Sequence, residues 1–235
     1  LADTLVANNF NAFGLGAAGL NCSSQCAVTV ERSEFIGNQG GFEGGAISIG
    51  LDSSTILRDS IVAHNRVVEN GGGVFAVDPT SLRVINSSFV GNRAGGAAGG
   101  DFPRGGGIFY GTNDNDAGQL SITHSTMLYN EADQGGGAFT NVLFGSIGPI
   151  NPVITDSEIY FNLGANGPAG SLNDSFINEG SSADVTFNNV EFGAGMLAAS
   201  NIDANPQHVA GLRLNAAGPV SPNIDAGSVQ ALTTE

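Results

Sequence analysis

Apolar and polar residues alternate along most of the chain, in short stretches separated by turns rich in Gly and Asn. The segments SEFI (residues 33–36) and GGAISI (residues 44–49) are examples. A period of two is typical of β-strands, and no stretch carries apolar residues at i, i+3, i+4 and i+7 over the length of a helix. Gly and Asn adopt left-handed backbone angles with little strain, which suits the turns. The pattern therefore predicts an all-β protein of many short strands.

The stretches recur with a period of roughly 30 residues, which indicates a repeat architecture. Each copy has an Asn with an apolar residue three positions before it; in the second copy these are Asn38 and Phe35, preceded by Ser33. The marker Asn residues are Asn8, Asn38, Asn65, Asn92, Asn130 and Asn162. The apolar residues before them are Leu5, Phe35, Val62, Phe89, Met127 and Ile159. Columns that keep their register over six copies indicate coils stacked on one another.

Two further apolar columns follow the same register. One lies five residues before the first column and consists of Val30, Leu57, Val84, Ile122 and Ile154. The other belongs to a strand that follows each Asn after a Gly-rich turn, with apolar positions expected at Ile47, Phe75, Phe109, Phe139 and Leu172. We expect these columns to form ladders in the interior, each residue packing on its copy in the next coil.

Short parallel strands with about one circuit every 30 residues predict a parallel β-helix of about six to seven coils. The Asn column is expected at a bend, where each side-chain amide donates to and accepts from its neighbours above and below. A leucine-rich-repeat horseshoe also carries an Asn in each repeat, but it needs more Leu and a helical return. We expect one domain over residues 1–235, with regular repeats in 1–175 and an irregular closing region in 176–235.

These residues resemble a known class. FIGN followed by GGAI, and FVGN followed by GGGI, resemble the paired FxxN and GGAI or GGAV repeats of bacterial polymorphic outer-membrane-type proteins. The passenger regions of that class are right-handed parallel β-helices. SPNIDAG (residues 221–227) is similar to the SPAIDAG segment that closes many secreted bacterial β-helix proteins. The resemblance implies an extracellular or cell-surface bacterial protein in a class that includes adhesins and surface structural proteins.

Charge narrows the choice of partners. The chain has 22 Asp and Glu residues against seven basic residues, all Arg, and a formal net charge of −15. Such a field repels phosphate backbones and anionic lipid headgroups, so we expect no nucleic acid partner. No apolar run approaches the roughly 20 residues of a transmembrane helix, so we expect no membrane insertion.

Two local motifs are candidates for bonds or ligands. Cys22 and Cys26 are close enough in CSSQC for a disulfide, with two free thiols as the alternative, and they lack the partner pair of a zinc site. In TNDNDAG, the residues Asn113, Asp114 and Asp116 offer the oxygen ligands that Ca²⁺ prefers. An ordinary turn is the alternative there, and we expect no cofactor other than calcium.

Two hypotheses about function remain open. The first is a non-catalytic structural or adhesive surface protein that associates end to end into fibres, because the first coil has no evident cap over its strand edges. The second is a polysaccharide lyase, a glycoside hydrolase or a glycan-binding module that uses the flank carrying the insertions after Asn92 and Tyr110. A hydrolase needs two carboxylates about 5 to 10 Å apart across a sugar, and the candidates Glu31 and Asp59 have no aromatic platform beside them. No catalytic residue is nominated.

Overall fold

The computed structural model describes residues 1–12, 14, 16–96, 103–112, 118–143 and 152–164, and beyond them the strands at 176–179, 184–186, 189–190, 208–209 and 213–214. All regular structure in this part of the chain is β. It accordingly includes no helix long and apolar enough to span a bilayer.

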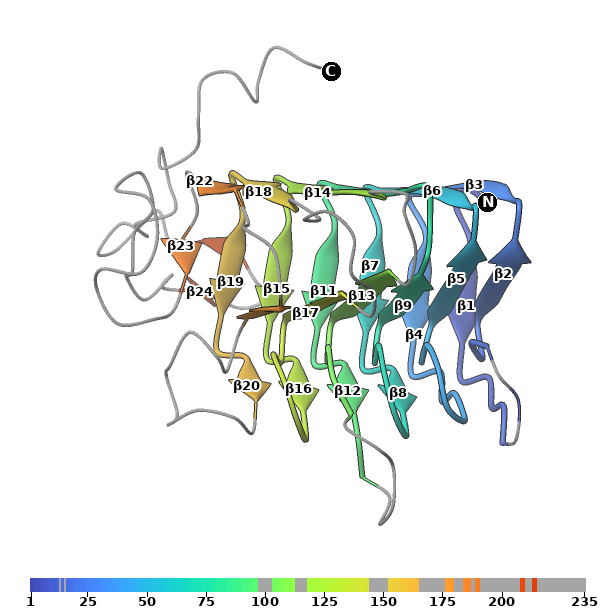
Figure 1. Ribbon diagram of the computed structural model, residues 1–235. Coiled ribbons are helices and arrows are strands. Elements are labelled where there is room, and N and C mark those ends of the chain that lie inside the picture. Colours follow the sequence, from blue (N-terminus) through green and yellow to red (C-terminus); the bar gives the residue numbers. More distant parts are fainter. Residues whose placement is uncertain are drawn as a thin grey trace.

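The strands stack into a parallel β-solenoid with four faces, named A to D in the order in which the chain visits them (Figure 1). Face A consists of β3 (Ala27–Glu31), β6 (Ser54–Arg58), β10 (Ser81–Ile85), β14 (Gln119–Thr123), β18 (Val153–Thr155) and β22 (Asp184–Thr186). Face B consists of β1 (Leu5–Ala7), β4 (Glu34–Ile36), β7 (Ile61–Ala63), β11 (Ser88–Val90), β15 (Thr126–Leu128), β19 (Glu158–Tyr160) and β23 (Asn189–Val190). Face C consists of β8 (Arg66–Val67), β12 (Arg93–Ala94), β16 (Glu131–Ala132) and β20 (Leu163–Gly164). Face D consists of β2 (Leu20–Ser24), β5 (Ile47–Leu51), β9 (Val74–Val77), β13 (Ile108–Thr112), β17 (Phe139–Leu143) and β21 (Phe176–Glu179).

The predicted fold class is confirmed, but the number of coils is smaller than expected. Five circuits place a strand in each of faces A, B and D. The strands β1 and β2 before them, and β22 and β23 after them, form incomplete circuits. The sequence-based count treated every copy of the repeat as a full coil, and the structure therefore has about five complete coils in place of six to seven.

The interior ladders on faces A and B follow the predicted register. On face A, Val30, Leu57, Val84, Ile122 and Ile154 pair in that order from coil to coil. On face B, Phe35, Val62, Phe89, Met127 and Ile159 do the same. All ten belong to one core cluster, and none is more than 1% exposed. Burial of each such side chain contributes about 1.5–3 kcal/mol, so the two ladders make a large contribution to stability.

The predicted Asn ladder lies at the bend between faces B and C. Asn38, Asn65, Asn92, Asn130 and Asn162 are all buried. Each Oδ1 accepts two hydrogen bonds from the Asn one coil earlier, from its backbone N–H and from its Nδ2, at 2.8–3.1 Å. Each Nδ2 also donates to a backbone carbonyl one coil earlier, as Asn65 does to Phe35 at 2.9 Å. The buried amides are thus fully used, which removes the cost of burying them.

A second polar ladder of Ser residues lies between faces A and B. Its members are Ser33, Ser60, Ser87, Ser125 and Ser157, each at most 5% exposed. The Ser60 Oγ accepts the Ser33 backbone N–H at 3.1 Å and donates to the Arg58 carbonyl at 2.7 Å. The other members repeat this arrangement. The hydroxyl is small enough to turn inward at the bend and satisfies two backbone groups there.

The first coil departs from the predicted register by one residue. Val6, not Leu5, pairs with Phe35, and Asn9, not Asn8, donates to the Oδ1 of Asn38. Asn8 has a φ of 55° at the corner of the coil and lies outside the ladder. Leu5 and Val6 are both apolar and Asn8 and Asn9 are both Asn, so composition does not distinguish the two registers. Burial distinguishes the two registers, because Leu5 is 63% exposed whereas Val6 packs against the core.

Face D also departs from the predicted register. Its interior ladder is Leu20, Ile47, Val74, Ile108 and Phe139, and Phe176 of β21 pairs with Phe139 in the same register. Phe75 and Phe109 follow Val74 and Ile108 by one position and therefore point to the outer surface. The prediction aligned the strands by their largest apolar residues. In GGAI and GGAF the apolar residue follows Ala, whereas in GGGV and GGGI it follows a third Gly and the Phe comes one position later. The prediction therefore placed Phe75 and Phe109 inside, although the backbone turns them outward.

The closing region retains part of the solenoid. Val185 pairs with Ile154 on face A and Val190 with Ile159 on face B, so these two sheets extend to Val190. Farther on, β24 (His208–Val209) and β25 (Arg213–Leu214) form an antiparallel pair. Leu172 lies outside the described residues.

Candidate functional site

A groove is hollowed into the outer surface of face D. The outward row of residues across this face runs Asn21, Ser48, Phe75, Phe109 and Thr140 in strand register. Small polar residues therefore stand in the first two coils and large aromatic ones in the next two. This step in side-chain size leaves a cavity of about 490 Å³ beside Phe75. Clefts that bind small ligands commonly have 300–1,000 Å³, so the groove has a suitable size.

The floor of the groove consists of β5, whose Ser48, Ile49 and Gly50 line it. Gly50 is required there, because a Cβ atom at this position would collide with the carbonyl oxygen of Ser23 in the preceding coil. A larger residue at position 50 would both push the coils apart and fill the groove. The close approach of the two backbones thus requires Gly at position 50, and no side chain rises from the floor there.

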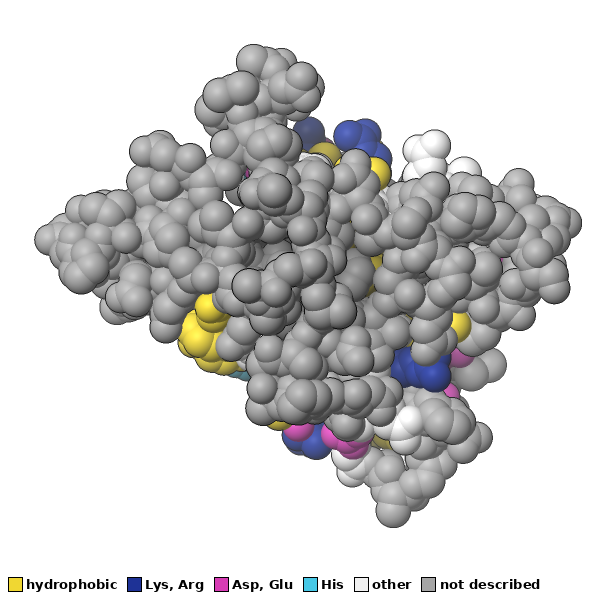
Figure 2. Space-filling view, turned by 60° about the vertical axis from the view of Figure 1, so that its left-hand side comes forward, with side chains coloured by type: hydrophobic (Ala, Val, Ile, Leu, Met, Phe, Trp, Pro, Cys, Tyr) yellow, Lys and Arg dark blue, Asp and Glu magenta, His cyan; other side chains and the backbone are white. Residues whose placement is uncertain are grey.

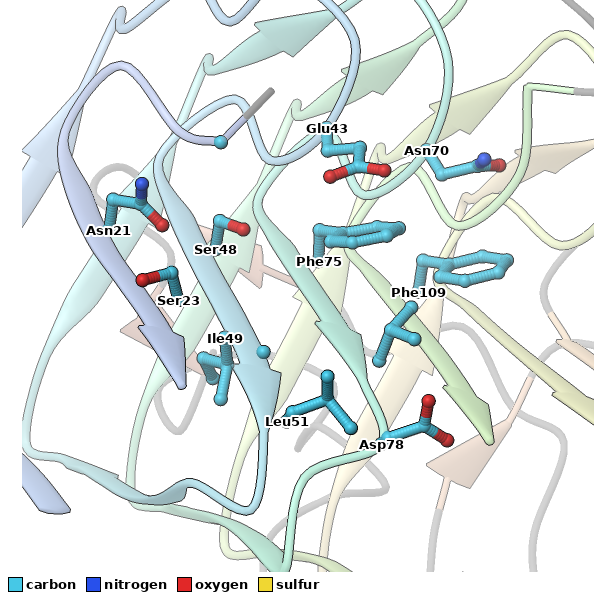
Figure 3. Close-up of a pocket in the computed structure, with 13 residues that line it drawn as sticks. Asn21, Ser23, Glu43, Ser48, Ile49, Leu51, Asn70, Phe75, Asp78 and Phe109 are labelled. Carbon is cyan, nitrogen blue, oxygen red and sulfur yellow. The ribbon is translucent and has the colours of Figure 1, made fainter. Parts of the chain in front are cut away.

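Two Phe rings form the apolar wall. The ring centroids of Phe75 and Phe109 lie 5.4 Å apart, with an interplanar angle of 8°. With Val77 and Val142 they make an apolar cluster separate from the interior core. Both rings line the groove and both are largely buried, Phe75 being 8% exposed and Phe109 2% exposed. Figure 3 shows the two rings side by side with Ser48 next to them.

Polar residues stand on both rims of the groove. Glu43 and Asn70 lie on one rim, on the turns that lead from face C to face D, and Asp78 lies on the other with Leu51 (Figure 3). The first rim is tied across coils, because the Gly44 N–H donates to the Asn70 carbonyl at 3.0 Å. The Asn70 Oδ1 in turn accepts the Arg104 backbone N–H at 3.0 Å. These bonds give the rim a defined position above the Phe pair.

The Glu43 carboxyl has an altered acidity. Partial burial raises its pKa above the usual 4.5, and the negative charge of Glu69 raises it further. Among the described residues that line the groove, none is basic. Glu43 and Asp78 are the acidic residues of this lining, one on each rim.

This arrangement is suited to a ring-shaped ligand with one apolar face and several hydroxyls. Aromatic side chains pack against apolar C–H groups, while carboxylate, amide and hydroxyl oxygens exchange hydrogen bonds with O–H groups. A sugar ring has both kinds of surface. The groove places both kinds of partner within a single cavity.

The predicted disulfide is present, and the calcium candidates are outside the described residues. Cys22 and Cys26 are bonded, with a Cα–Cα distance of 6.2 Å, and the bond closes the turn that follows β2 beside the groove. Asn113, Asp114 and Asp116 fall in a segment that the structure does not describe. In the part it does describe, no three His, Cys, Asp or Glu residues gather closely enough to hold a metal ion.

The other acidic candidates, Glu31 and Asp59, make contacts with polar side chains at the surface. Glu31 contacts Arg58 at 2.5 Å and Arg32 at 3.3 Å, and Asp59 accepts a hydrogen bond from Asn86 at 2.6 Å. Figure 2 shows basic side chains beside acidic ones in the lower part of the view. Exposed pairs of this kind contribute about 0–1 kcal/mol each, so they adjust the surface more than they stabilise the fold. Glu31 and Asp59 form no site together.

Reasoning from the sequence missed the groove. Phe75 and Phe109 were placed in the core, and Glu43, Asn70 and Asp78 were not singled out. One signal was available: GGGVF and GGGIF carry a third Gly and a second apolar residue that GGAIS lacks. That difference marks a strand with apolar residues on both sides, which indicates something packed against or bound to its outer face.

A scan against protein-family models and searches of curated proteins and solved structures found no match for the chain. The parallel β-solenoid therefore rests on the structure itself, and the resemblance of the repeats to bacterial surface proteins stays an expectation.

Proposed function

We propose that this protein is an extracellular or cell-surface β-helix with an adhesive role and no catalytic activity, and that the groove on face D holds a glycan. One observation carries the proposal. The stacked pair of Phe75 and Phe109 adjoins a cavity of about 490 Å³ whose two rims bear Glu43, Asn70 and Asp78. In this proposal the ring face of a sugar lies against Phe75, and its hydroxyls bond to the two rims.

The placement of the acidic residues favours binding. Glu43 and Asp78 lie on opposite rims of the groove, with Phe75 between them (Figure 3). Carboxylates at opposite rims suit contacts with two ends of a ligand, and the long β-sheet face suits an extended chain of sugars.

Glycan binding is tested with the purified chain and oligosaccharides of known composition. The variant Ser48→Phe places a third ring in line with Phe75 and Phe109 and fills the cavity. We expect it to weaken binding at least about tenfold, equivalent to 1.4 kcal/mol. The matched control is Thr29→Phe, which adds the same ring to the exposed side of face A. Binding that survives in Ser48→Phe, or that is absent from the parent, would contradict the proposal, and release of reducing ends would support an enzyme.

End-to-end association is a second proposal. The strands β1 and β2 are edge strands of faces B and D. Leu5 and Phe10 on this coil are 63% and 68% exposed, which is unusual for large apolar side chains. Unpaired strand edges with apolar residues beside them promote pairing with another chain. The proposed occupant is a second copy of this chain, and sedimentation velocity over a range of concentrations tests it.

A further inference from the structure

The disulfide between Cys22 and Cys26 is joined to a strand that lines the groove. Cys22 lies at the centre of β2, and its neighbours on either side, Asn21 and Ser23, both line the groove. Side chains alternate along a strand, so Asn21 and Ser23 point outward while Cys22 points inward and is only 5% exposed. Any movement of Cys22 therefore moves the two residues of β2 that a ligand would meet.

Few non-covalent contacts hold β2 in place. Among the described strands it pairs with β5 alone, as the edge strand of face D. Cys22 is its one buried residue, and the other four are half-buried or exposed. A strand with one paired edge and little buried surface opens locally at low cost in free energy. The disulfide adds a covalent restraint, because it ties the middle of β2 to Cys26 in the turn beyond the strand.

Cys26, in contrast, is fixed by the next coil. Its N–H donates to the Ser53 Oγ at 3.3 Å, and its carbonyl accepts the Ser54 N–H at 2.9 Å. Neither bond uses a sulfur atom, so loss of the disulfide would leave Cys26 in place and free Cys22. The element that would move is therefore β2.

We propose that this disulfide is a redox switch for the groove. In the oxidised chain it holds β2 in the position that binds a glycan, and its reduction by a dithiol releases the strand and weakens binding. The inference rests on the proposed function, because it concerns the regulation of the same groove. Disulfides persist in oxidising surroundings and are reduced in the cytosol. The groove is thus complete only when the chain is in an oxidising environment.

The chemical step is thiol–disulfide exchange. Cys26 is partly exposed and Cys22 is buried, so a thiolate of the dithiol attacks the Cys26 Sγ, and the Cys22 Sγ leaves as a thiolate. The second thiolate of the reductant then displaces the Cys26 Sγ from the mixed disulfide. The two protons of the dithiol pass through solvent to the two Cys sulfurs. Two electrons move from the reductant to the chain, and the reductant becomes a cyclic disulfide.

The test compares the oxidised chain with the chain reduced by dithiothreitol. Oligomers of glucose, N-acetylglucosamine and galacturonic acid are titrated against both forms by calorimetry. We expect reduction to weaken binding at least about fivefold, because Asn21 and Ser23 must then be ordered as the ligand binds. Hydrogen exchange should become faster in residues 20–25 and stay unchanged in β9 and β13. Reoxidation should restore both the affinity and the exchange rates.

The double variant Cys22→Ala with Cys26→Ser removes the bond without a reductant. It should bind as weakly as the reduced parent, and dithiothreitol should not change its affinity, which controls for effects of the reductant on the ligand. Equal affinities of the oxidised and reduced parent would overturn the inference alone. Loss of the whole fold on reduction, or affinity that does not return on reoxidation, would also overturn it. Absence of binding in both states would overturn the proposed function and this inference together.

Discussion

The Oδ1 atom of Asn65 accepts two hydrogen bonds from Asn38, from its backbone N–H and from its Nδ2, both at 2.9 Å. Both residues are fully buried. No water is available at the bend to replace these bonds, so each rung of the ladder satisfies groups that would otherwise be costly to bury. The ladder therefore links neighbouring coils through contacts that only Asn makes in this geometry.

Asn65→Ala should be strongly destabilising. It leaves the backbone N–H and the Nδ2 of Asn38 without their acceptor, and each unsatisfied buried group costs about 1–3 kcal/mol. We expect a loss of about 3 kcal/mol or more in the free energy of unfolding, measured by denaturant titration. Asn86→Ala is the control, because the Asn86 side chain is exposed and donates to Asp59, and with the strain of Ala at a φ of 46° it should cost about 1–2 kcal/mol. Similar losses in the two variants would argue against the ladder.

The two kinds of Phe should respond differently to truncation. Phe89 is fully buried in the interior ladder, so Phe89→Ala should cost about 3–5 kcal/mol. Phe75 borders the groove, so Phe75→Ala should cost about 1–3 kcal/mol and should also weaken glycan binding. Denaturant titration and calorimetry on the same samples measure both effects. If Phe75→Ala and Phe89→Ala lost the same stability and glycan binding were unchanged, Phe75 would have only a structural role.

Much of the fold could be predicted from the sequence, because the interior column of face B keeps fixed distances from two polar columns. Phe35 comes two residues after Ser33 and three residues before Asn38, and the later copies keep both distances. On face D the adjacent residues Val74 and Phe75 are both apolar, as are Leu5 and Val6 in the first coil, so composition does not choose between the two registers. Since side chains alternate between the two faces of a strand, an error of one residue exchanges inside and outside. The groove was missed for that reason.

The register of the first coil can be tested directly. Val6 packs against the core and Leu5 is exposed, so Val6→Asp should destabilise the protein by about 2 kcal/mol or more, whereas Leu5→Asp should change stability by less than about 0.5 kcal/mol. Leu5→Asp should also reduce end-to-end association in sedimentation velocity. The opposite order of stabilities would favour the register in which Leu5 faces inward.

Partial burial, and next the negative charge of Glu69, raise the pKa of Glu43, which affects stability. The folded state holds the Glu43 proton more tightly than the unfolded state does. The protonated carboxyl therefore contributes to the free energy of unfolding at low pH, and this contribution is lost as the pH rises through the pKa of the folded state. Glu43→Gln should therefore be at least as stable as the parent at neutral pH, as measured by thermal melts.

The groove is a property of adjacent coils. Its floor comes from β5, its wall from β9 and β13, and each coil repeats the backbone of the previous one, with Asn38 and Asn65 separated by 27 residues. Duplication of a single repeat would thus lengthen the scaffold without redesigning its interior. A change from Phe to Ser in one outward row would open a new recess farther along the axis. The molecule separates the residues that hold the coils together from those that meet a ligand, so its binding surface is free to diverge while its architecture is inherited unchanged.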